Sequence, residues 1–185
     1  GGAVVLSHAQ NRGVGAALRT GIDHARQERF EIVAILSGDD QHDPSELPAV
    51  LEPLLSGGFD LAQGSRWLSG GRTVDMNLFR RVTTWIYPVL FRLATGFPST
   101  DATNGFRAFR LAILDDSRID LSQEWLETYE LEPYLLYKAV STGKRVTEVP
   151  ITIVYHDRGT TKMKGLRDWW RITRPLIFLT LGLRR

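Results

Sequence analysis

Short apolar runs alternate with helical segments in the middle of the chain, and this alternation constrains the fold more than any other feature. Residues 32–36 (IVAIL) are apolar, rich in β-branched side chains and closely followed by Gly38, which is typical of a buried strand. A helix is expected next, with Asp43 as its N-cap and Pro44 at its first position. Residues 59–63 predict a second strand. Strand, helix and strand in this order favour a parallel sheet with crossover helices.

Further elements follow from apolar periodicity and turn residues. The pattern predicts strands at 3–7 and 146–154, and helices at 16–29, 78–97, 129–140 and 166–183. Polar clusters at 37–43 and 64–66 come directly after the two strands of the central unit, and 101–107 is expected to be a loop. Because ligands bind at the carboxyl ends of strands in such sheets, the first two clusters are candidate site residues.

The composition is that of an ordinary globular protein, and it excludes several kinds of site. The chain has 185 residues, which fits one domain, and no cysteine, which excludes disulfides and cysteine-based zinc sites. Its four histidines show no metal-binding spacing. No apolar run reaches the ~20 residues needed to span a bilayer.

Charge is unevenly distributed along the chain. The stretch from Arg158 to Arg185 contains eight basic residues and one acidic residue, whereas the remainder contains fifteen basic and twenty acidic residues. A basic tail on a neutral-to-acidic body suggests an anionic partner, such as membrane phospholipid, a lipid phosphate or nucleic acid. The basic stretch lacks a nucleic-acid reading motif, so no nucleic-acid partner is expected.

An acidic loop follows the first central strand. It reads Ser-Gly-Asp-Asp-Gln-His-Asp over residues 37–43. Several oxygen ligands at the end of a strand suit a hard divalent cation, which could also bridge a diphosphate. The alternative is a solvated acidic turn that leads into a capped helix.

Six motifs in one order give the sequence its resemblance to a known family. Residues 39–44 (DDQHDP) resemble the DxD-x-Q-x-D-P signature of family 2 glycosyltransferases. In this alignment Asp39 occupies the position of the second aspartate, and Ser37, two residues earlier, occupies the position of the first. Residues 101–107 (DATNGFR) resemble D-x-x-S/N-G-F-R of the polyprenyl-phosphate sugar synthases. The other matches are 11–21 (NRGVGAALRTG) to N-x-G-K-G-A-A-x-R-x-G, 64–66 to G-S-R, 148–151 to E-V-P-I, and 158–162 to the R-x-x-G-x-S-K loop.

The resemblance implies an α/β fold of the GT-A type, a Rossmann-like sandwich with a mainly parallel sheet. The family's first strands have no counterpart in this sequence, so we expect an N-terminally truncated catalytic domain over 1–165. Residues 166–185 are expected to form an amphipathic helix at the C-terminal end, lying in the membrane interface.

The resemblance also assigns roles to individual residues. It implies that Asp39 and Gln41 hold Mg²⁺ or Mn²⁺ against the donor diphosphate. The implied donor-binding residues are Arg12, Gly13, Arg19, Asp39 and Arg66. The implied acceptor-binding residues are Asp101, Arg107, Arg158 and Lys162. Asp39 and Arg107 are the implied catalytic residues.

The implied reaction transfers a hexose from GDP- or UDP-hexose to polyprenyl (dolichyl or undecaprenyl) phosphate, with inversion. We expect it at the cytoplasmic face of a membrane, with the protein peripheral or tethered by segments outside this chain. Helices 78–97 and 166–183 combine bulky apolar residues with arginine, which suits a membrane surface, although ordinary core-packing helices are the alternative. Two other functions stay open: transfer to a soluble or glycan acceptor, and a non-catalytic remnant that binds a membrane or a partner.

Overall fold

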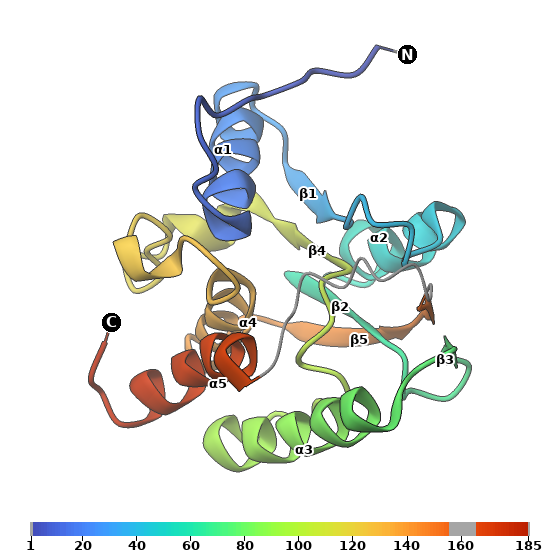
Figure 1. Cartoon of the computed structure of the whole chain (residues 1–185). Coiled ribbons are helices and arrows are strands. Elements are labelled where there is room, and N and C mark those ends of the chain that lie inside the picture. The colour runs from blue at the N-terminus through green and yellow to red at the C-terminus, as the bar shows by residue number, and fades with distance from the viewer. Residues whose placement is uncertain (1, 156–165, 185) are drawn as a thin grey trace.

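The computed structural model describes residues 2–155 and 166–184, which form a mixed α/β fold (Figure 1). Its main helices are α1 (Val14–Gln27), α2 (Leu47–Leu55), α3 (Leu78–Thr95), α4 (Leu131–Ser141) and α5 (Leu166–Thr180). Its strands are β1 (Ile32–Ile35), β2 (Leu61–Ser65), β3 (Arg72–Val74), β4 (Arg107–Arg110), β5 (Val146–Pro150) and β6 (Thr152–Val154). Short 3₁₀ helices occupy Pro44–Glu46, Leu111–Asp115 and Glu124–Leu126.

The main sheet has the strand order β1-β4-β2-β5. Strands β2 and β5 are parallel, and β4 runs antiparallel to both β1 and β2. Strands β1, β2 and β5 therefore share one direction, which confirms the α/β fold with a mainly parallel sheet. Strand β4 is not predicted by the sequence pattern, and it lies between the two strands of the predicted β1-α2-β2 crossover.

Side chains alternate across this sheet and separate two apolar cores. On β2, Leu61 packs into the core that contains α3, α4 and α5, whereas Ala62 packs into the core beneath α2. On β4, Phe109 packs into the first core and Ala108 into the second. All four side chains are completely buried. The alternation follows from the two-residue period of a strand and accounts for the layers on either face of the sheet.

Two strand predictions require correction. The segment 3–7 forms no strand, and Val4 and Val5 are 71% and 82% exposed. Among the described residues it has no neighbouring strand to satisfy its backbone, so its apolar character alone does not make it a strand. The predicted strand 146–154 is divided into β5 and β6 at Ile151, whose N–H donates to Ser65 O at 3.0 Å and whose carbonyl accepts from Arg72 N at 3.1 Å. The chain thereby passes from the main sheet to the small β3-β6 sheet.

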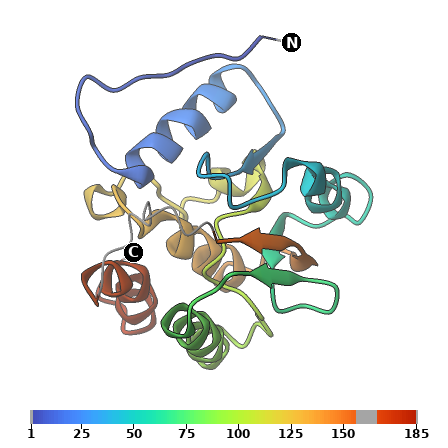
Figure 2. The same cartoon turned by 45° about the vertical axis from the view of Figure 1, so that its right-hand side comes forward.

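Helices α3 and α5 lie side by side at the end of the molecule opposite α1, as Figures 1 and 2 show. Tyr87 and Phe91 of α3 and Ile172 and Leu176 of α5 enter one core. The prediction of core-packing helices is therefore correct for one face of each helix. No helix within the described ranges is long and apolar enough to cross a membrane. The predicted boundary between residues 165 and 166 stays a prediction.

Candidate active site

Three of the predicted motifs, in residues 37–43, 64–66 and 101–107, meet at one end of the main sheet. Ile35 at the end of β1 and Gln63 near the end of β2 both lie opposite Arg107, the first residue of the antiparallel β4. The loops that follow β1 and β2 therefore meet the loop that precedes β4. We call residues 37–43 the acidic loop and residues 99–106 the Asn104 loop. Their meeting point is the carboxyl-end position at which the sequence analysis placed a site.

The acidic loop is anchored through its backbone and presents a carboxylate to solvent. Gln41 O accepts a hydrogen bond from Val154 N at 3.0 Å, and Asp39 Oδ1 accepts one from Gln41 N at 3.3 Å. Asp40 takes a positive φ of 62°, which turns the chain sharply between these residues. Asp39 is exposed, whereas Gln41 is partly buried.

Asp43 has a structural task, as predicted. Its carboxylate accepts a hydrogen bond from Ser45 N at 2.8 Å and caps the 3₁₀ turn that leads into α2. Hydrogen bonds from the side chain and then from the backbone N–H of Ser45 hold the pKa of Asp43 below its ordinary value. Glu46 then secures the turn to β6, because its two carboxylate oxygens accept from Thr152 N at 3.0 and 2.9 Å.

The residues present fit a cation whose coordination is completed by a substrate. Among the described residues, no three histidine, aspartate or glutamate side chains are grouped to hold a metal ion. Asp39, Gln41 and Ser37 nevertheless offer oxygen atoms in one loop. A cation such as Mg²⁺ typically binds one or two carboxylates together with substrate phosphates. A diphosphate-bridged cation suits this donor set better than a site built from protein ligands alone.

Glu132 brings a carboxylate close to the acidic loop, and the sequence analysis did not single it out. A Cβ built on Gly105 would lie 3.1 Å from Glu132 Oε1 and 3.8 Å from Ser37 Oγ. The side chain of Glu132 is 21% exposed and lies 3.8 Å from the Nε of Arg107. Its proximity depends on the packing of α4 against the sheet, which no local motif reports.

Arg66 and Asp101 form a buried ion pair. Arg66 Nε and Nη2 donate to the two Asp101 oxygens at 2.6 and 3.1 Å, and Arg66 also bonds Tyr155 Oη. The side chains are 5% and 0% exposed. Burial opposes the charged guanidinium, but Asp101 and Tyr155 outweigh it and raise the pKa of Arg66. The predicted donor contact of Arg66 and acceptor contact of Asp101 stay predictions; the geometry gives both residues a role in holding the Asn104 loop.

Glu148 of β5 fixes the start of the Asn104 loop. Its carboxylate accepts from Ser99 Oγ at 2.7 Å, from Thr100 N at 2.8 Å and from Asp101 N at 3.1 Å. A carboxylate that accepts several backbone N–H groups is a strong local anchor. Glu148 of the E-V-P-I motif therefore positions Asp101 from strand β5.

Arg107 points into the protein. Its guanidinium donates to the carbonyls of Glu132 at 2.7 Å and Asn104 at 2.5 Å, and its side chain is only 1% exposed. Burial lowers the pKa of Arg107 from its ordinary value. The predicted catalytic and acceptor-binding role of Arg107 stays a prediction, because the described contacts join β4 to α4 and the Asn104 loop. Arg158 and Lys162 lie outside the described residues.

The glycine-rich turn before α1 makes a close backbone contact. Gly13 has a φ of 94°, and Ala16 N donates to Glu127 O at 3.0 Å. A Cβ on Gly15 would lie 2.0 Å from Leu126 O. Because these glycines have no side chain, the 126–128 segment can pack closely against the start of α1. The N–H of Ala16 in the first turn of α1 is thus bonded within the protein.

The two arginines of this region are also engaged with neighbouring chain. Arg12 forms an ion pair with Glu127 at 3.1 Å, with both side chains well exposed. Arg19 Nη2 donates to Gln123 O at 3.3 Å. Both contacts lie beside the 126–128 segment and leave the predicted donor roles of Arg12, Gly13 and Arg19 as predictions.

Gly15 and Gly21 form a matched pair for testing this contact. Gly15→Ala is expected to destabilise the protein by about 1–3 kcal/mol, because the new methyl would overlap backbone atoms that cannot move aside easily. Gly21 lies inside α1 with nothing within 4 Å of its would-be Cβ. Gly21→Ala is expected to stabilise by about 0.5–1 kcal/mol through helix propensity. Urea unfolding of both variants checks this, and equal effects would contradict the close contact.

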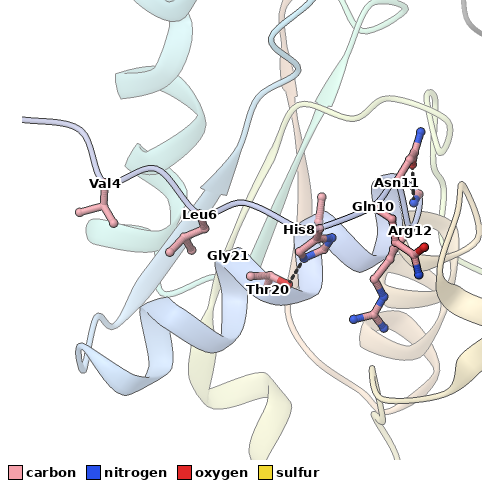
Figure 3. Close-up of a pocket in the computed structure, with 10 residues that line it drawn as sticks. Val4, Leu6, His8, Gln10, Asn11, Arg12, Thr20 and Gly21 are labelled. Atoms are coloured by element: carbon pink, nitrogen blue, oxygen red, sulfur yellow. Dashed lines mark hydrogen bonds between the residues drawn. The ribbon is translucent and has the colours of Figure 1, made fainter.

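A groove lies between the N-terminal segment and α1 (Figure 3). It has a volume of about 380 Å³, and His8 Nε2 and Thr20 Oγ1 meet across it at 2.8 Å. Its lining includes Arg12 and Gly13 but neither Asp39 nor Arg66. The predicted donor-side residues are thus distributed over two places, the groove and the end of the sheet.

Arg80 adds a positive charge beside the Arg66–Asp101 pair. Its guanidinium carbon lies 4.7 Å from the centre of the Tyr155 ring, and the Tyr155 hydroxyl contacts Arg66. The sequence pattern indicates only that Arg80 belongs to an amphipathic helix. Arg80 is the third residue of α3 and contacts Tyr155, the residue after β6, because α3 packs beside that strand end.

Comparison with known proteins identifies the family of this chain. Residues 1–118 match the model of glycosyl transferase family 2. The chain belongs to this family. It is 31% identical over 161 residues to undecaprenyl-phosphate mannosyltransferase of Micrococcus luteus and 32% identical over 161 residues to polyprenol monophosphomannose synthase of Mycolicibacterium smegmatis. The alignments cover 87% of this chain in each case, and 65% and 60% of the two relatives.

Among solved structures, the family 2 chain resembles glucosyl-3-phosphoglycerate synthase of Mycobacterium tuberculosis in complex with Mn²⁺, uridine diphosphate and phosphoglyceric acid. The TM-score is 0.63 at 18% sequence identity, over 94% of this chain and 55% of that one. This likeness confirms the GT-A fold. The chain thus spans about three fifths of the length of these relatives and somewhat over half of the solved structure.

Proposed function

We propose that the chain is the catalytic part of a glycosyltransferase that moves a hexose from a nucleotide diphosphate sugar to polyprenyl phosphate. The observation that carries the proposal is the meeting of the acidic loop with the Asn104 loop at the end of the sheet, built from motifs in the family's order. The names of the two mannose-transferring relatives support the lipid phosphate acceptor. GDP- and UDP-hexose both stay candidate donors.

The proposed chemistry rests on positioning and on charge. The attacking group would be an oxygen of the acceptor phosphate, which is largely a dianion near neutral pH because its second pKa is ~6. No strong general base is then required, and in-line attack at C1 inverts the anomeric centre. Asp39 and Gln41 would hold Mg²⁺ or Mn²⁺. When bound, that cation neutralises charge on the leaving diphosphate. Arg158 and Lys162 are proposed to bind the acceptor phosphate.

A transfer assay tests this function and separates it from the alternatives. We expect labelled hexose to pass from GDP- or UDP-hexose to a short polyprenyl phosphate when Mn²⁺ or Mg²⁺ is present. EDTA should abolish the transfer, and added Mn²⁺ should restore it. Transfer to a soluble glycan but not to the lipid would favour the second enzyme function. Absence of both transfer and nucleotide binding would favour a non-catalytic remnant.

The exposed faces of α3 and α5 are proposed to rest on a membrane surface. Several of their bulky apolar residues are exposed, among them Leu78, Phe79, Trp85, Leu93, Trp170 and Ile177. Arginines accompany them on both helices. Apolar side chains beside basic ones match the requirements of the headgroup region of an anionic bilayer. On this proposal the protein is peripheral at the cytoplasmic face, or tethered there by segments outside this chain.

Vesicle binding tests the membrane surface. The double variant Trp85→Glu/Leu93→Glu is expected to weaken binding to anionic vesicles at least tenfold, since two exposed apolar anchors worth ~1.5–3 kcal/mol each would be lost. The matched control is Leu55→Glu, which replaces a leucine that is 66% exposed on α2, away from α3 and α5 (Figure 1). Sedimentation with vesicles measures both. Equal binding by the double variant and the control would contradict this surface.

A further inference from the structure

His42 joins the two loops of the candidate site. Its Nε2 lies 3.2 Å from Asn104 Oδ1, and its ring packs against Phe106 with the ring centres 5.3 Å apart. Its backbone forms a bridge to Ile153 of β6. The residue follows Gln41 directly and precedes the Asp43 cap. The ring is therefore the side-chain link between the acidic loop and the Asn104 loop.

The partners of Asn104 determine which atom donates in this link. Asn104 Oδ1 accepts a hydrogen bond from Phe106 N at 2.9 Å, and a backbone N–H can only donate. Asn104 Nδ2 donates to Asp101 Oδ2 at 3.4 Å. These two contacts fix the orientation of the amide. Since Oδ1 is the acceptor, the Nε2 of His42 must carry the hydrogen.

The other ring nitrogen supports the same assignment. His42 Nδ1 is buried and has no hydrogen-bond partner among residues 2–155 and 166–184. A hydrogen on Nδ1 would be a buried, unpaired donor, which is unfavourable by ~1–3 kcal/mol. The neutral ring with hydrogen on Nε2 gives its single N–H an acceptor in Asn104 Oδ1 and leaves no buried N–H of the ring unpaired.

The remaining contacts of Asn104 tie this link to the sheet. Asn104 O accepts from Gln63 Nε2 at 2.6 Å and from Arg107 Nη2 at 2.5 Å. Asn104 thus has its backbone fixed by β2 and β4 and its side chain bonded to His42. A displacement of the His42 ring would move the acidic loop relative to a loop that is itself held rigidly.

We propose that His42 is a positioning residue whose Nε2–H bond to Asn104 sets the acidic loop in register with the Asn104 loop for sugar transfer. The inference rests on the proposed function, because it assigns the donor side to the first loop and the acceptor side to the second. His42 itself touches neither the metal nor the substrates in this scheme. Its contribution is the relative placement of the groups that do.

Two substitutions separate the hydrogen bond from the ring. His42→Gln places an amide nitrogen near the former Nε2 and keeps a donor to Asn104, whereas His42→Phe keeps an aromatic ring against Phe106 and loses the donor. His42→Phe is expected to lower kcat for transfer roughly 10- to 100-fold, as misplacement of reacting groups does. The KM for the donor should change by less than about threefold. His42→Gln should retain most of the wild-type kcat.

Nuclear magnetic resonance of the ¹⁵N-histidine-labelled chain provides a readout that does not require activity. The expected spectrum shows hydrogen on Nε2 of His42 and none on Nδ1 at pH 7.5. Hydrogen on Nδ1 would overturn the inference. So would equal kcat values for wild type and His42→Phe, or equal losses in His42→Phe and His42→Gln. If the wild type transfers no sugar, the proposed function fails and the positioning role fails with it, while the spectrum still decides the His42–Asn104 bond.

Discussion

Asp39→Ala is expected to weaken Mn²⁺-dependent nucleotide binding about 100-fold or more, given that even residues behind the metal ligands change affinity 10- to 100-fold. Asp39 presents an exposed carboxylate, whereas Asp43 caps a helical turn and has a task of its own. The protein supplies few of the proposed ligands to the cation, and the diphosphate supplies the others. The loss of one carboxylate should therefore weaken metal-dependent nucleotide binding strongly. Calorimetric titration with GDP and UDP, with and without Mn²⁺, measures the effect.

Ser37→Asp tests the opposite change, the addition of a carboxylate to the acidic loop. It restores a carboxylate at the position where the family signature has its first aspartate, and Ser37 Oγ already lies beside Gly105 at the end of the sheet. We expect this variant to bind Mn²⁺ about tenfold more tightly in the absence of nucleotide, which corresponds to about 1.4 kcal/mol. Nucleotide binding that is unchanged in Asp39→Ala and independent of Mn²⁺ would contradict a metal site in the acidic loop.

Local sequence signals were sufficient for most elements of this fold. The apolar run before Gly38 and the Asp43-Pro44 start of a helical turn each specify a boundary through backbone chemistry. Helix α3 ends at Thr95, before the αL residue Gly96, two residues short of the predicted end at residue 97. Strand β4 was missed because it has only four residues, begins and ends with arginine, and depends on its two neighbours. The segment 3–7 was assigned wrongly for the converse reason, because strand-like composition needs a partner strand.

In the site, as in the fold, features set by neighbouring residues in the sequence were predicted, whereas contacts between residues far apart in the sequence were not. The motifs located the acidic loop and the Asn104 loop, since turn residues and strand ends are visible in sequence. They did not reveal that Arg66 faces Asp101, that Arg107 is buried beneath α4, or that Glu132 lies near Ser37. Those contacts join residues 25 to 95 positions apart and depend on the packed fold.

Asp101→Ala is expected to destabilise the protein by about 3–5 kcal/mol, the usual effect of removing one partner of a buried ion pair. The carboxylate is fully buried and accepts hydrogen bonds from Arg66 Nε at 2.6 Å and from Arg66 N at 3.1 Å. Its removal would leave a buried guanidinium with Tyr155 as its remaining side-chain partner among the described residues, and Asn104 Nδ2 would lose its acceptor. Urea unfolding, followed by circular dichroism, gives the free energy of unfolding for comparison with wild type.

A matched control distinguishes burial from the mere presence of an ion pair. Asp115 pairs with Arg26 at 2.8 Å, but the two side chains are 68% and 47% exposed. Asp115→Ala should therefore change the free energy of unfolding by less than about 1 kcal/mol. The double variant Arg66→Met/Asp101→Ala should recover part of the loss, since it removes the unpaired charge together with its partner. If Asp101→Ala were as mild as Asp115→Ala, the buried pair would not hold the Asn104 loop, and its residues would be free for the substrate contacts that the family motifs imply.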